Sequence, residues 1–162
     1  MAPKRIVGYT APMATEVLFY HLERQPLEAV LPMLLEKTLA RGWRAVIEVG
    51  DPARLQPLNA LLWTYKPESF LPHGTKADGP PAEQPVYLTT EADNPNNATV
   101  LFLVEGAAPA GFAGYDRIVL LFDGRNPDAL AMARRHWKSA KEAGTKLTYW
   151  QQSDEGRWQQ KG

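Results

Sequence analysis

The sequence predicts an α/β protein, a single domain of three layers in which helices cover both faces of a mostly parallel β-sheet. Short apolar segments that are typical of strands alternate with segments whose apolar residues recur at helical spacing. Several strand segments are apolar throughout, which is typical of strands buried on both faces. The 162 residues fit one domain, and no repeat or linker divides them.

The first half of the chain predicts strands and helices in alternation. Gly42 is a stop signal for the first helix, and Pro32 is expected to kink that helix or to mark a late start. Asp51 and Pro52 are typical of an N-cap and a first helical position, so they open the second helix. The expected elements are a strand at 16–22, a helix at 26–42, a strand at 44–50 and a helix at 51–63.

The second half predicts four strands and the clearest helix of the chain. That helix has Asn126 as its cap, Pro127 at its first position and Gly144 at its end. Residues 71–85 contain little that could pack, so we expect a surface loop there. The expected elements are strands at 86–90, 99–106 and 117–124, the helix at 126–144 and a last strand at 146–150.

The two ends of the chain predict tails around one domain. Residues 1–14 lack the apolar run of a signal peptide and are interpreted as an N-terminal tail. Residues 15–152 are expected to form the domain, and 153–162 a polar C-terminal tail. No apolar run approaches the length of a membrane span, and the chain has no Cys, which excludes disulfides and thiolate metal sites. These features favour a cytoplasmic protein without membrane contact.

The sequence lacks the usual motifs of an enzyme. No glycine-rich dinucleotide or phosphate motif joins a strand to a helix, and no G-x-S-x-G occurs. The three histidines, His21, His73 and His136, have no ligand at metal spacing. We therefore expect no catalytic residue, no metal and no cofactor. The alternative is an α/β enzyme acting on nucleotides or nucleic acid, and it depends on the α/β pattern and the glycine-rich segment 106–114.

Charge is unevenly distributed along the chain, although the total is zero. Residues 125–162 contain eight basic and four acidic residues, a net charge of +4, and the remainder has a net charge of −4. This asymmetry predicts an acidic partner at the C-terminal end of the protein.

One side of the helix expected at 126–144 combines cations with an aromatic ring. Because Arg134 and Trp137 are three residues apart, they can border one shallow pocket. Such a pocket suits an acidic peptide with an aromatic end, because its carboxylates pair with the cations while its ring fills the pocket. The alternatives are a solvated basic face with Trp137 in the core, and direct binding of single-stranded DNA. The cations near this side are Arg134, Arg135, Lys138 and Lys141.

A second aromatic cluster lies where the helix at 51–63 ends. Trp63 and Phe70 flank Pro67, and proline predicts a loop. Loops lie on the surface, so aromatic rings there are expected to be covered by a partner.

Two blocks of this sequence resemble the chi subunit of bacterial DNA polymerase III holoenzyme. They are LNALLWTYKPESFLPHG and ARRHWKSAKEAGTKLTYWQQ, and the first strand, EVLFYHLE, also fits that family. The resemblance covers roughly residues 15 to 152. It implies an α/β fold and a non-catalytic accessory subunit of the clamp loader.

The resemblance also implies two partner surfaces. Trp63, Pro67 and Phe70 would contact the psi subunit, which tethers the chi subunit to the clamp loader, or another partner such as a helicase-like repair protein. A second surface would bind the acidic C-terminal tail of single-stranded-DNA-binding protein, which ends in Phe. The protein would then form a bridge, and its contact with single-stranded DNA would be indirect.

The tail surface is carried over by matching position. Arg134, Trp137 and Lys138 match the family's tail pocket, and Leu130 stands where some members have a basic residue. The cations added on charge alone are Arg135 and Lys141.

Overall fold

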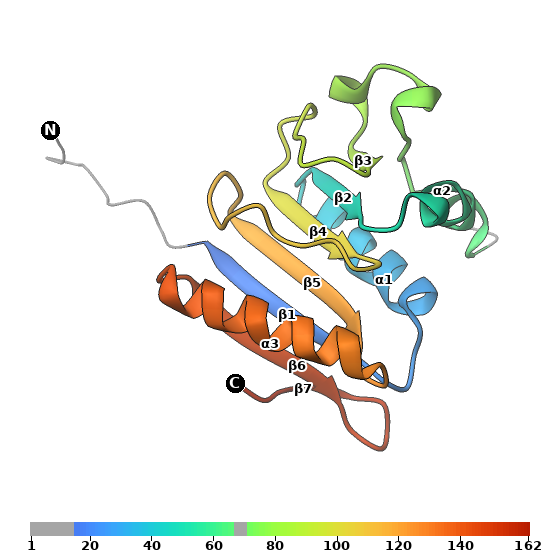
Figure 1. The fold of residues 1–162 in the computed structure, drawn as a ribbon. Helices are drawn as coiled ribbons and strands as arrows, with labels where there is room; N and C mark the ends of the chain where they lie inside the picture. The colour runs from blue at the N-terminus through green and yellow to red at the C-terminus, as the bar shows by residue number, and fades with distance from the viewer. Residues whose placement is uncertain (1–14, 67–70) are drawn as a thin grey trace, which may run out of the picture.

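A computed structural model describes residues 15–66 and 71–162 of the chain. Within these ranges, seven strands form one sheet in the order β3-β2-β4-β5-β1-β6-β7 (Figure 1). The strands are β1 (Glu16–Leu22), β2 (Ala45–Val49), β3 (Val86–Thr89), β4 (Val100–Val104), β5 (Arg117–Asp123), β6 (Lys146–Gln152) and β7 (Trp158–Gln160). The α-helices are α1 (Leu27–Ala40), α2 (Leu55–Thr64) and α3 (Pro127–Glu142), and the short 3₁₀ turns are η1 (Pro52–Arg54), η2 (Lys76–Asp78) and η3 (Pro81–Glu83).

The sheet is parallel except at one edge, where β7 runs antiparallel to β6. β1 lies between β5 and β6, and β4 lies between β2 and β5. The prediction of one α/β domain with a mostly parallel sheet is therefore confirmed. Among the described helices, none is both long and apolar enough to span a bilayer.

Helices cover the sheet on both faces and so create two apolar cores. The side chains of a strand alternate between faces, so β1 directs Leu18 and Leu22 to one core and Val17 and Phe19 to the other. The first core packs against α1 and α2, and the second packs against α3. This arrangement is the predicted three-layer order, with α3 in a layer of its own (Figure 1).

Local signals explain where the helices begin. Asn126 caps α3 by accepting hydrogen bonds from the backbone N–H groups of Asp128 and Ala129, as expected. Asp51 caps the 3₁₀ turn that precedes α2, where its carboxylate accepts from Ala53 N at 3.0 Å. Pro32 does not delay α1, because the helix begins at Leu27 and contains this proline.

Two segments differ from the sequence-based expectation. Residues 153–162 were expected to be a polar tail, but they contain β7, which pairs Gln152 with Trp158 and Trp150 with Gln160. Sequence patterns do not indicate this strand because it is short and polar. A half-buried Trp158 ring attaches it, 5.1 Å from the Tyr20 ring. The expected tail at 1–14 lies outside the described residues.

Residues 71–75 also pack more closely than a surface loop would. Leu71, His73 and Thr75 are each buried, and Gly74 forms a parallel bridge with Tyr87 of β3. The segment therefore covers the open edge of the sheet beside β3. The apolar content of 71–85 was too low to predict this, because its burial depends on backbone pairing.

Candidate functional site

The α3 helix presents one side to the sheet and another to solvent. Ala133 and Ala140 are buried against the second core, while Trp137 and Leu130 are half-buried beside them. These four residues are the stripe that helical spacing predicts. The side chain of Trp137 is held in place, since its ring lies 5.2 Å from Phe19 in an edge-to-face arrangement.

The exposed cations of α3 lie next to this indole. Arg134, Lys138 and Lys141 are all exposed, and within residues 15–66 and 71–162 none of them forms an ion pair with a carboxylate. We call these three cations together with Trp137 the basic face. Because a helix turns about 100° per residue, the three cations and Trp137 share adjoining sides of α3. An unpaired cation beside an apolar ring is what an acidic peptide with an aromatic residue requires.

Arg135 is exposed and, one residue after Arg134, lies about 100° around α3 from it. Burial, and then the positive charge of Arg135, lower the pKa of His136. His136 lines a cavity whose lining does not include Trp137. The structure thus brings Arg134, Trp137, Lys138 and Lys141 together, and it places Arg135 at the margin.

Tyr149 of β6 packs beneath the basic face, and no spacing pattern in the sequence indicates it. Its ring lies 5.8 Å from Trp137, and its hydroxyl lies 2.6 Å from His21 Nδ1. Burial raises the pKa of Tyr149, while the charge of Arg134 opposes this rise and that of Glu23 adds to it. The hydroxyl therefore stays protonated at neutral pH.

The aromatic surface at the end of α2 is described only in part. Trp63 has 46% of its surface exposed, the highest among the large apolar side chains that the structure describes. Its ring lies 4.2 Å from the ring of His73, which is itself buried between Leu71 O and Asn59 O. Pro67 and Phe70 lie outside the described residues. The Trp63 ring therefore packs against His73 and remains partly exposed to solvent.

A cavity of about 480 Å³ lies at the carboxyl ends of β1, β4 and β5. Gly106 and Ala107 line it, so part of the glycine-rich segment does reach a hollow. Its charged lining opposes phosphate binding, because most of it is carboxylate and His136 is uncharged at neutral pH. The charged residues that line it are Glu28, Glu105, Asp123, Arg125 and Asp128.

The three histidines lie in different places, as their separation in the sequence suggests. His21 lies in β1, His73 lies under Trp63, and His136 lines the cavity. In the described part of the chain, no group of His, Asp and Glu side chains could hold a metal ion.

Comparison with known proteins gives a consistent match. A family model described as the DNA polymerase III chi subunit, HolC, matches residues 14–148. The chain is 40% identical over 85 residues to the probable DNA polymerase III subunit chi of Rickettsia prowazekii, and the aligned part spans 52% of this chain and 52% of that relative. It is 26% identical over 136 residues to the DNA polymerase III subunit chi of Pseudomonas aeruginosa, over 82% of this chain and 94% of that protein. The match thus spans about half the length of the first relative.

Proposed function

Because the chain belongs to the DNA polymerase III chi subunit family, we propose that this accessory subunit binds the acidic, Phe-ended tail of single-stranded-DNA-binding protein. In this proposal it does no chemistry. It links the clamp loader to the protein that coats the single-stranded template, and its contact with DNA is indirect.

The basic face is the observation that supports the tail as a ligand. Arg134 and Lys138 are exposed and have no carboxylate partner in the part of the chain that the structure describes. Trp137 lies beside them, and Phe19 and Tyr149 fix its ring. Carboxylates of the tail would pair with the cations, and its Phe ring would pack against the indole.

A weak contact is sufficient for this role. Exposed ion pairs contribute little each and are screened by salt, so one tail should bind with modest affinity that falls as salt rises. Attachment to the clamp loader and the presence of several tails on one coated strand raise the effective concentration. The bridge can therefore hold while its single contacts exchange.

The second surface gives the protein its attachment to the polymerase. We infer that Trp63, with Pro67 and Phe70, contacts the psi subunit or another protein in its place. The exposed indole of Trp63 supports this inference, because a large ring at the end of a helix is typical of an interface anchor.

The first experiment is a titration of a labelled tail peptide, followed by fluorescence anisotropy. We expect the wild type to bind with an affinity that decreases with salt, and Arg134→Ala to lower that affinity about tenfold or more. Arg157→Ala is the matched control, because Arg157 is also exposed but lies in the β6–β7 turn. Circular dichroism checks that each variant is folded.

Two results would contradict the proposal in different ways. Equal binding by the wild type and Arg134→Ala would place the tail elsewhere on the protein. Absence of salt-sensitive binding by the wild type would remove the tail as a ligand. In the same assay, tight binding of a bare oligonucleotide at physiological salt would favour direct binding of single-stranded DNA.

A further inference from the structure

Lys161 lies directly beside the basic face, although it is far from α3 in the sequence. Its backbone N–H donates to Tyr149 O at 2.6 Å, so the chain after β7 stays paired with β6. The next residue, Gly162, accepts from Tyr149 N at 3.3 Å. The end of β7 is thereby held opposite the tyrosine that supports Trp137.

The alternation of β7 directs the Lys161 side chain to the α3 side of the sheet. Trp158 packs on Tyr20 in the other core, so side chains at even positions of β7 face away from α3. Gln159 and Lys161 take the opposite direction, and both line a hollow with Gln151 of β6. Lys161 therefore projects on the same face as Tyr149.

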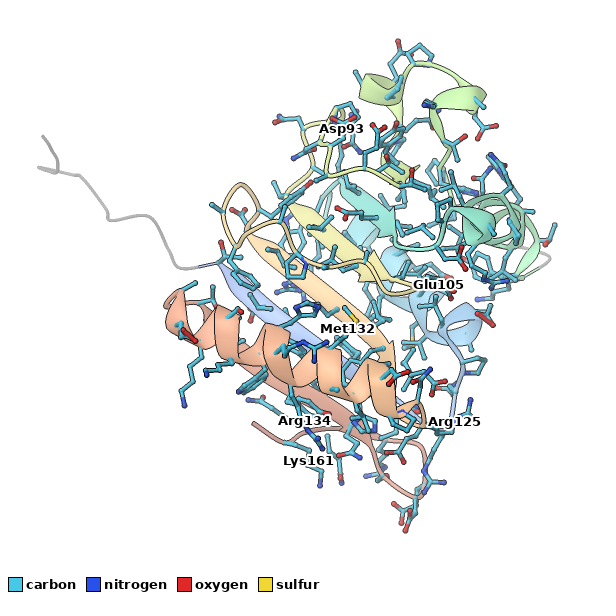
Figure 2. All side chains as sticks on the ribbon, viewed as in Figure 1. Asp93, Glu105, Arg125, Met132, Arg134 and Lys161 are labelled. Atoms are coloured by element: carbon cyan, nitrogen blue, oxygen red, sulfur yellow. The ribbon has the colours of Figure 1, made fainter. Side chains whose placement is uncertain are left out.

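Trp137 packs against the Tyr149 ring, with the ring centroids 5.8 Å apart. Arg134 precedes Trp137 by three residues on α3, so the two side chains lie on the same side of the helix. A Cβ built on Gly162 would lie 3.5 Å from Trp137 Cη2, so the residue after Lys161 faces the indole. Figure 2 labels Arg134 on α3 and Lys161 near the end of the chain.

We propose that Lys161 is a further binding residue for the acidic peptide, so that β7 forms the second wall of the site whose first wall is α3. This inference rests on the proposed function of the basic face. Lys161 is exposed and, like the α3 cations, has no ion pair with a carboxylate among the residues described. A peptide lying between the two walls meets cations on both sides.

The charges around Lys161 also give the peptide a direction. On the side of Lys161 toward the β6–β7 turn, the hollow of about 380 Å³ is lined by the carboxylates of Glu23, Asp154 and Glu155 and by Arg24, which pairs with Asp154. On the other side, α3 continues to Lys138 and Lys141. Like charges repel an acidic chain, so its carboxylates lie along Lys161, Lys138 and Lys141 and away from the turn.

The test is the tail-peptide titration with Lys161→Ala, and with Lys146→Ala as the matched control. Lys146 is an exposed lysine of neighbouring β6, but the alternation of that strand directs it away from Tyr149. We expect Lys161→Ala to lower the affinity about three- to tenfold and to flatten its salt dependence, because one exposed ion pair is lost. Lys146→Ala should leave the affinity within about twofold, since surface charges outside the contact contribute little.

A second peptide, with amides in place of its acidic side chains, separates charge pairing from packing. Binding of this peptide should be weaker and should no longer differ between the wild type and Lys161→Ala. Unchanged binding of the acidic peptide to Lys161→Ala, when Arg134→Ala still weakens it, would overturn the role of Lys161 alone. If the wild type does not bind the acidic peptide at all, the proposed function is overturned and this inference with it.

Discussion

At the scale of a single residue, Gly124 leaves the space in which the His21 ring packs and supports Tyr149 beneath the basic face. A Cβ at this position would lie 1.9 Å from His21 Nε2, far inside contact distance. The His21 ring therefore occupies space that only glycine leaves open. Through its Nδ1, 2.6 Å from the Tyr149 hydroxyl, the same ring fixes Tyr149 under Trp137.

We predict that Gly124→Ala lowers the free energy of unfolding by about 1–3 kcal/mol, because the ring must move and a buried hydrogen bond is lost. Urea denaturation followed by circular dichroism measures the change. Gly111→Ala is the control, since nothing lies within 4 Å of a Cβ there and the change should be nearly neutral. Equal effects of the two substitutions would contradict the prediction.

The residues of the basic face divide into those that local spacing could predict and those that it could not. Arg134, Trp137 and Lys138 lie within one helix, where three- and four-residue steps fix which side chains meet. Lys161 joins them only through the pairing of β7 with β6. That register depends on Trp158 packing against Tyr20, a contact between residues far apart in the chain. No pattern in the polar segment 153–162 indicates it.

At the scale of elements, η2 is a short turn with an unusually complete cap. Thr75 and Asp78 form a capping box, in which the Asp78 carboxylate accepts from the Thr75 backbone N–H at 2.8 Å. This backbone hydrogen bond is the main cause of a lowered Asp78 pKa. Burial opposes it as the second-largest effect, and the Thr75 hydroxyl and the Asn59 amide lower the pKa further by smaller amounts. The cap attaches the segment that covers β3 to α2.

The cap gives a pH-dependent prediction. A carboxylate whose pKa is lower in the folded state contributes stability above its unfolded pKa, and this contribution is lost as pH falls through the folded value. Asp78→Ala should therefore lower stability at neutral pH by about 1 kcal/mol or less, because the carboxylate is exposed. The difference from the wild type should shrink as the pH falls below about 4.

Chemical denaturation across this pH range measures the effect. Glu83→Ala, an exposed carboxylate in neighbouring η3, serves as the control and should show no such trend. A difference between wild type and Asp78→Ala that is the same at every pH would contradict the role of the ionised carboxylate.

The elements themselves were predictable to different degrees for one physical reason. Strand β4 and the centre of β5 are apolar because both of their faces are buried, so composition alone indicates them. The helix α3 has cap signals at its start and a clear apolar stripe. β7 and the segment 71–75 belong to the fold through backbone pairing at the two edges of the sheet, and backbone pairing leaves no mark on composition.

At the scale of the whole molecule, the two proposed surfaces lie on opposite faces of the sheet. α2 packs in the layer of α1, near β3, and α3 covers the other face over β1, β5 and β6 (Figure 1). The net charge of +4 lies in residues 125–162, the segment that contains α3, and the remainder of the chain carries −4. A bridge needs this separation, because two partners must bind one small domain without excluding each other.

We predict that the two partners bind together and nearly independently. Sites that share no contact and no movable element have small coupling energies, so saturating the tail site should change the affinity for the clamp-loader partner by less than about twofold. Trp63→Ala should abolish capture of that partner and leave the tail affinity unchanged, and Arg134→Ala should do the reverse. Surface plasmon resonance with immobilised clamp-loader complex, with and without saturating tail peptide, measures both. Competition between the two ligands would mean that they share a surface, and the protein could then not act as a bridge.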